Sequence, residues 1–327
     1  MQTINSFILR LFRKLYSKAF GTYQLPPLRR EEDPDKASEM IYNLLVSDKP
    51  CMIARFGANE LDAVVNYLGV NSKSHSILKY IIGEQPEWWW NEGIMYCMQN
   101  NAGFFPAIPK NMQRFGEMMI EDVKEVDLLG SWLNNESKIF DNDHLQSVCL
   151  IFLDPFWASS PWTRALKNKK ILVVHPFAEI IETQYKNKRK YLFEKKDILP
   201  EFQLQTIKAV QSLGGMDNGF KDWFEALDYM KKEIDKCDYD ICLIGCGAYG
   251  FPLAAHVKRM GKKAIHMGGS LQLLFGIIGK RWENPNHGSV ELKKKGCYPQ
   301  LINKYWIRPD SKNVPINKDR VEGGCYW

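Results

Sequence analysis

The chain has 327 residues, of which 45% are hydrophobic and 25% are charged, so it has the composition of a globular protein and not of a disordered one. Its formal net charge is +6, and the first thirty residues hold six Lys or Arg and no acid. The remaining 38 basic and 38 acidic residues balance. We therefore expect no nucleic-acid partner, because such proteins carry their basic excess on the folded domain.

Residues 1–22 predict a basic amphipathic helix, with apolar residues at helical spacing on one face and Arg10, Arg13, Lys14 and Lys18 on the other. Such a helix is typical of attachment to an anionic membrane surface, and docking on the chain's own domain is the alternative. No run reaches the roughly 18 apolar residues of a membrane span, and no signal-peptide pattern is present. We expect a cytoplasmic protein, peripheral at the inner face of the cell membrane.

Residues 23–34, with Pro26 and Pro27, predict a linker, and residues 35–327 predict one catalytic domain. The expected helices are 35–47, 59–68, 178–194, 220–236 and 252–260. The expected strands are 51–57, 148–153, 170–175, 239–244 and 263–267. The region 74–145 is expected to be mostly helical. The strands are short, apolar and non-alternating, which is typical of parallel strands covered on both faces. The alternation of strands and helices predicts an α/β fold: a Rossmann-like, doubly wound, mostly parallel sheet in a single main domain with a helical insertion.

The clearest motif is Gly245-Cys-Gly-Ala-Tyr-Gly250, which follows an expected strand and precedes an apolar helix. This is the setting of a phosphate-binding loop, so Gly245, Gly247 and Gly250 are expected to bind a ligand. The next strand ends in His266-Met-Gly-Gly269, without the acid that holds the ribose of a dinucleotide. His266, Gly268 and Gly269 instead suit another phosphate or a uracil-type base.

Three further segments carry polar groups. Arg55 to Glu60 and His175 to Glu179 follow expected strands, where ligands bind in open α/β sheets, and Lys280-Arg281 follows two glycines and suits a diphosphate. Each has a structural alternative. Arg55 and Glu60 suit an ion pair at a helix start, His175 suits a helix cap, and the Lys280-Arg281 pair suits a solvated turn.

The run Arg55-Phe-Gly-Ala-Asn-Glu60 is similar to the R-x-G-D-G-E signature of GT-D-type glycosyltransferases. The later runs 244–253, 263–269 and 275–282 resemble the C-terminal half of that group, and the resemblance spans about residues 35–290. It implies a single Rossmann-like domain that moves a sugar from a nucleotide-diphosphate donor, commonly a UDP-sugar, to a capsule- or O-antigen-type surface glycan. The acceptor is expected to be a glycan or a lipid-linked molecule.

The resemblance also implies roles for the candidate residues. In the family, the D-x-E carboxylates serve a divalent metal and the donor diphosphate. Here Ala58 replaces the Asp, Asn59 replaces the second glycine, and only Glu60 matches. Glu60 is thus the candidate ligand of Mn²⁺ or Mg²⁺, and Arg55, Lys280 and Arg281 are the alternative source of positive charge. The candidate donor-binding residues are Arg55, Gly57, Gly245, Gly247, Gly250, His266, Gly268, Gly269, Lys280 and Arg281, and the candidate catalytic residues are Glu60, His175 and Glu179.

Two other functions fit the sequence. The glycine loop suits a Rossmann-type nucleotide-cofactor enzyme, either a methyltransferase or an oxidoreductase, although the missing ribose acid argues against it. The loss of the motif's Asp suits a non-catalytic protein that binds sugar nucleotides.

Overall fold

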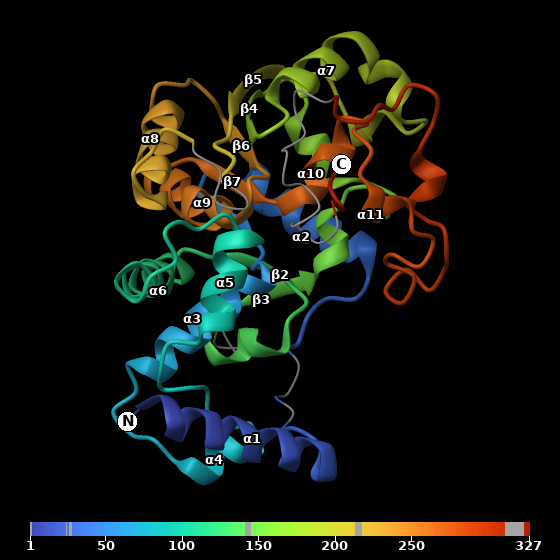
Figure 1. The fold of residues 1–327 in the computed structure, drawn as a ribbon. Helices are drawn as coiled ribbons and strands as arrows, with labels where there is room; N and C mark the ends of the chain where they lie inside the picture. The colour runs from blue at the N-terminus through green and yellow to red at the C-terminus, as the bar shows by residue number, and fades with distance from the viewer. Residues whose placement is uncertain (1, 24, 26–27, 141–144, 213–217, 311–323) are drawn as a thin grey trace.

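The computed structural model describes residues 2–23, 25, 28–140, 145–212, 218–310 and 324–327. The fold is α/β, with one seven-stranded, all-parallel sheet between two layers of helices (Figure 1). The strands are β1 Cys51–Ala54, β2 Leu128–Ser131, β3 Gln146–Cys149, β4 Lys170–His175, β5 Gln203–Lys208, β6 Ile241–Ile244 and β7 Lys263–His266. Their order in the sheet is β3-β2-β1-β7-β6-β4-β5, and the predicted Rossmann-like, doubly wound class is confirmed.

Neighbouring side chains of a strand point to opposite sides of the sheet. The central strands are buried on both faces because helices cover each side. In β1, Met52 and Ala54 join one hydrophobic core, and Cys51 and Ile53 join the other. The first core is covered by α3 Ala58–Val70, α5 Glu92–Asn100, α6 Pro109–Val123, α8 Trp223–Asp235 and α9 Gly250–Arg259. The second core is covered by α2 Pro34–Val46, α7 Ala178–Leu192, α10 Leu271–Leu274 and α11 Lys280–Glu283.

Neighbouring strands diverge at three places along the carboxyl edge of the sheet. The chain leaves β1 for α3 on one face, whereas it leaves the neighbouring β7 for α10 on the other. The next strand, β6, leads to α9 on the first face again, and its neighbour β4 leads to α7 on the opposite face. Ligands of open α/β sheets bind where neighbouring strands diverge in this way.

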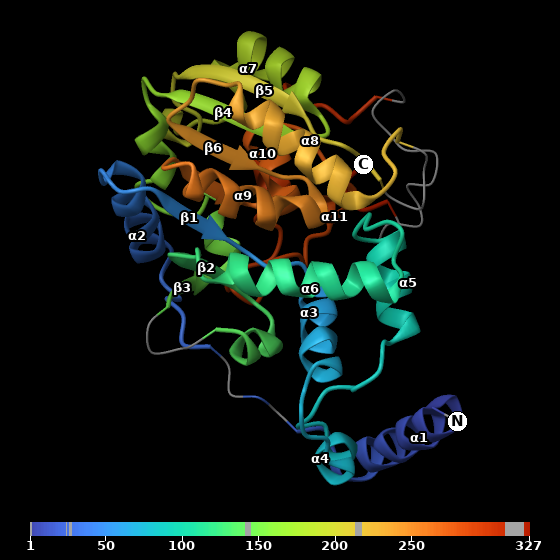
Figure 2. The same ribbon diagram turned by 90° about the vertical axis from the view of Figure 1, so that its left-hand side faces the viewer.

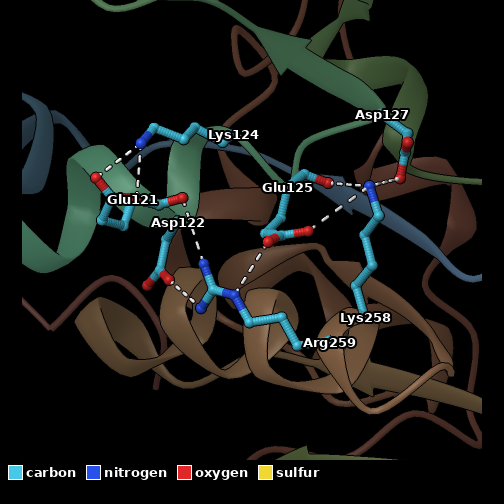
Figure 3. Close-up of polar contacts among 7 residues, drawn as sticks. All are labelled: Glu121, Asp122, Lys124, Glu125, Asp127, Lys258 and Arg259. Carbon is cyan, nitrogen blue, oxygen red and sulfur yellow. Dashed lines mark hydrogen bonds and ion pairs between the residues drawn. The ribbon is translucent and has the colours of Figure 1, made fainter.

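Ion pairs hold α9, the helix after the glycine loop, against the end of α6 (Figure 3). Arg259 Nη1 lies 2.6 Å from Asp122 Oδ1, and its Nε lies 3.0 Å from Glu125 Oε1. Lys258 Nζ lies 2.8 Å from Asp127 Oδ2. Burial raises the pKa of Asp122 to about 6, although its bond to Arg259 acts in the opposite direction. The network fixes the position of the helix that carries the loop.

The segment α1 Gln2–Phe20 lies beside α4 Ile77–Ile82, and together they form a layer separate from the sheet (Figures 1 and 2). The predicted N-terminal helix is therefore present. No helix among the described residues combines the length and the apolar character that crossing a bilayer requires. In the segment expected to be a linker, Glu31 forms a parallel β-bridge with Val148 of β3. The end of this segment therefore lies against the sheet.

Three parts of the sheet differ from the prediction. β2 lies in the region expected to be mostly helical, and only Leu128 and Leu129 of its four residues carry apolar side chains. β5 is an edge strand in which exposed and half-buried residues alternate, and we expected no strand there. The strand expected over 148–153 ends at Cys149, because Leu150–Leu153 forms a 3-10 turn.

Candidate functional site

A cavity of about 500 Å³ lies at the carboxyl edge of the sheet. It spans the diverging strands, because the segments at the ends of β1, β2, β4, β6 and β7 all line it. Its lining includes Arg55, Gly57, Glu60, Trp132, His175, Gly245, Gly247, His266, Gly268, Gly269, Arg281, Tyr326 and Trp327. The cavity therefore brings together most of the residues that the sequence singles out.

The glycines of the loop after β6 have different roles. Gly247 has a φ of +56°, a left-handed conformation that other residues adopt rarely. A Cβ on Gly245 would lie 2.6 Å from the Gly268 carbonyl oxygen, so this glycine lets two loops pack together. Gly250 does not line the cavity, and a Cβ there would lie 2.1 Å from Cε1 of His266. Gly250 therefore makes room for the His266 ring.

Two buried histidines reach the cavity in the neutral form. Nδ1 of His175 accepts a hydrogen bond from the Phe177 backbone N–H at 3.0 Å, so the proton of the neutral ring lies on Nε2. Burial lowers the pKa of His175 to about 3. In His266, Nδ1 lies 3.4 Å from the Ile244 carbonyl oxygen and donates to it, which leaves Nε2 as an acceptor. Burial, helped by the charge of Arg55, lowers the pKa of His266 to about 3.

Arg55 lies against an aromatic wall of the cavity. Its Cζ is 5.2 Å from the centroid of the Trp132 ring, and Trp132 Nε1 donates a 2.9 Å hydrogen bond to the Phe56 carbonyl oxygen. Burial lowers the pKa of Arg55, whereas Tyr326 and Glu60 act in the opposite direction. The guanidinium remains charged at neutral pH, since arginine is not deprotonated in proteins.

A buried carboxylate behind the cavity holds the segment that carries Trp132. Glu136 Oε2 accepts a 2.6 Å hydrogen bond from Ser131 Oγ and a 3.3 Å bond from the Trp132 backbone N–H. Burial raises the pKa of Glu136, and these bonds and the charge of Arg55 act against that rise. Trp132 and Glu136 are not among the residues predicted for the site, because no strand is predicted at β2.

Glu60 is the one acidic residue among the described residues that line the cavity. It stands in the first turn of α3, and its carboxylate folds over Gly57, where a Cβ would lie 1.9 Å from Oε2. Its charge also acts on Arg55. The carboxylate thus has both of the environments that the sequence suggests, a helix N-terminus and a ligand cavity.

Residues 324–327 close one side of the cavity. The backbone N–H of Arg281 donates a 2.9 Å bond to the Cys325 carbonyl oxygen, and Arg281 Cζ lies 4.8 Å from the Tyr326 ring centroid. Gly269 allows this contact, because a Cβ there would lie 2.1 Å from Tyr326 Cε1. Sequence reasoning missed this aromatic segment, and no local pattern marks it.

Three sequence-predicted residues lie outside the cavity. Glu179 is 74% exposed and forms a 3.2 Å ion pair with Lys208, because the first turn of α7 directs it to solvent. Lys280 is exposed and does not line the cavity, although the adjacent Arg281 does. With Gly250 beneath His266, these three positions are not part of the cavity lining. We therefore leave Glu179 and Lys280 out of the mechanism proposed below.

Among the described residues, no group of three or more His, Cys, Asp or Glu side chains is placed to hold a metal ion. Divalent Mg²⁺ and Mn²⁺ prefer oxygen ligands, and the described lining offers one carboxylate, Glu60, close to the charge of Arg55. The described lining therefore offers a metal ion one protein carboxylate.

Comparisons with models of protein families, with curated proteins and with solved structures find no match to this chain.

Proposed function

We propose that the chain is a GT-D-type glycosyltransferase, which moves a sugar from a nucleotide-diphosphate donor to a surface-glycan acceptor. The observation that carries the proposal is the meeting of a glycine loop, two arginines and a single carboxylate in one cavity at the diverging strands. The similarity of Arg55 to Glu60 to the family signature supports the same function.

The donor diphosphate binds between Arg55 and Arg281, with the backbone of Gly247 beside it. Guanidinium groups suit phosphate because they offer several donors in a planar array. Negative charge grows on the diphosphate as the bond to the sugar breaks, so fixed cations stabilise the transition state. No step of this proposal passes through a metal ion, because Glu60 is the one acidic side chain of the described lining and no cluster of metal ligands accompanies it there.

The nucleotide base binds near the two neutral histidines. Nε2–H of His175 is a donor and Nε2 of His266 is an acceptor, and a uracil ring presents both carbonyl acceptors and an N–H donor. The Trp132 ring, 41% exposed, offers a flat surface for a base or a sugar. These features favour a UDP-sugar as donor.

Glu60 acts on the acceptor. As a carboxylate in the cavity it accepts the proton of the acceptor hydroxyl, which a reaction that inverts the anomeric centre requires. Neutral His175 is not suited to this role, because its free ring nitrogen carries a proton and its pKa is lowered to about 3.

Calorimetric titration with UDP, UDP-sugars, NAD and S-adenosylmethionine tests the proposal. We expect UDP and at least one UDP-sugar to bind, in buffer containing EDTA, and the two cofactors not to bind. Binding of NAD or S-adenosylmethionine instead would establish the nucleotide-cofactor alternative. Binding of a UDP-sugar without release of UDP in the presence of glycan acceptors would favour a non-catalytic binding protein.

A further inference from the structure

A second cavity, of about 640 Å³, lies between α1 and the body of the protein. It is lined by residues of α1, of α3, of the segment around α4 and of the 3-10 turn Asn134–Lys138. Its charged lining residues are Arg10, Arg13, Lys14, Asp62, Glu87 and Lys138. Four cations thus face two acids in a partly enclosed space.

The acids do not balance the cations. Arg10 is paired with Glu87, with Nε 3.1 Å from Oε1. Arg13 lies over the Tyr80 ring, with Cζ 4.9 Å from its centroid. Lys138 has no acidic partner among the described residues, and burial and the charge of Arg13 lower its pKa. Cations gathered in one space repel one another. An anion bound between them would offset this repulsion.

The orientation of α1 supplies an independent observation. Arg10, Arg13, Lys14 and Ser17 share one helical face and line the cavity. The opposite face exposes Ile8, Leu11, Phe12 and Leu15, and Phe7 is 70% exposed. In the neighbouring α4, Ile77 is 59% exposed and Leu78 is 69% exposed. An exposed apolar face opposite a basic face is the pattern of a helix that lies in a membrane interface.

We propose that this cavity binds the phosphate headgroup of a membrane lipid while the exposed apolar residues of α1 and α4 enter the acyl layer. The cations match the charge of the phosphate, and the apolar face matches the chains attached to it. The sequence predicts both faces of the helix, but only the structure turns Arg10 and Arg13 inward, where they border a cavity.

The lipid site adjoins the sheet-edge cavity. α3 carries Glu60 at the first cavity and Asn66 at the second, and six residues of helix span about 9 Å. The segment after β2 likewise carries Trp132 at the first cavity and Lys138 at the second. This spacing brings Glu60 within reach of a sugar linked to the bound phosphate. This last step, which makes a lipid-phosphate-linked sugar the acceptor, rests on the proposed function.

Vesicle flotation of the full chain tests the lipid site. We expect flotation with phosphatidylcholine vesicles that contain phosphatidic acid, and far less with phosphatidylcholine alone. Lys138→Ala should lower the partition coefficient about fivefold or more, since each cation near an anionic surface contributes on that scale. Lys36→Ala, which removes an exposed cation of α2, should leave it unchanged. Equal flotation of the Lys138→Ala and Lys36→Ala proteins would overturn the assignment.

A second pair of variants tests the apolar face. Phe12→Ser should weaken flotation on both kinds of vesicle, whereas Val290→Ser, at an exposed apolar residue elsewhere, should not. Stabilisation by inorganic phosphate that Lys138→Ala abolishes, without any vesicle binding, would assign the cavity to a soluble phosphate and overturn the lipid. UDP binding measured on the same samples separates the two proposals. Retained UDP binding without flotation overturns only the lipid site, and flotation without UDP binding overturns only the proposed donor.

Discussion

At the residue scale, the fold gives adjacent side chains different environments. Lys280 and Arg281 look equivalent in the sequence, as two cations after a glycine. In the structure Lys280 is exposed, whereas Arg281 lies over Tyr326 and lines the sheet-edge cavity. The pair therefore offers a variant and a matched control at neighbouring positions.

We expect Arg281→Ala to raise the dissociation constant for UDP about ten- to a hundredfold, because it removes a charged hydrogen-bond donor to phosphate. Lys280→Ala should change the constant less than about twofold, as expected for a screened surface charge. Calorimetric titration of both folded variants measures the effect. Similar constants for the two variants would show that the diphosphate does not bind beside Arg281.

Glu60 separates a catalytic role from a structural one. If it accepts the acceptor's proton, Glu60→Gln should keep UDP binding and lower sugar transfer about a hundredfold or more. If it only complements the N-terminus of α3, the variant should lose about 0.3–1 kcal/mol of stability and transfer sugar normally. Turnover and the melting temperature of the same variant decide between these results.

At the element scale, a buried acid joins the 3-10 turn Leu150–Leu153 to a distant part of the chain. Asp154 follows this turn and accepts a 2.5 Å hydrogen bond from Tyr298 Oη. Burial raises the pKa of Asp154 to about 6, although the bonds from Tyr298 and Ser270 oppose the rise. Tyr298 in turn packs against His287, which lines the sheet-edge cavity.

This carboxyl group should make stability depend on pH. Its pKa is higher in the folded state than in the unfolded chain, so the folded state binds the proton more tightly and stability falls as pH rises from about 4 to about 6. The loss amounts to roughly 3 kcal/mol for a shift of this size. Asp154→Asn should lack it. Denaturant unfolding at pH values on either side of this range tests the difference, and equal pH dependence in both proteins would contradict it.

The predictability of the elements follows from their length and burial. β1, β4, β6 and β7 are apolar runs followed by glycine or a helix, so the sequence indicates them. β2 has two leucines followed by Gly130 and Ser131, and β5 carries polar residues at an exposed edge, so neither reads as an apolar run. The class of fold is predictable because the central strands suffice to indicate it.

The residues of the site that could be predicted are those at the ends of the indicated strands. Arg55, His175 and His266 end or follow indicated strands, and the carboxyl ends of parallel strands meet at one edge. Trp132 follows a strand that was not indicated, and Tyr326 reaches the cavity through a long-range return of the chain. Such residues are found only when the tertiary structure is known.

At the scale of the whole molecule, α3 connects two cavities of different character. One lies at the diverging strands and is suited to a nucleotide diphosphate, and the other lies under α1 and is suited to a lipid phosphate. Donor and acceptor would thus reach Glu60 from the first turn and from the middle of the same helix. This arrangement would keep the polar donor in water and the acceptor at the membrane.

The central claim is that the donor binds in the sheet-edge cavity. Hydrogen–deuterium exchange of the full chain, with and without saturating UDP-sugar in EDTA, tests it most directly. We predict slower exchange in residues 245–250, 266–269 and 279–282, which come from separate elements and each contribute to the lining of this cavity. We predict unchanged exchange in α2, none of whose residues lines it. Protection confined to other segments, or no protection at a concentration that saturates binding, would contradict the account.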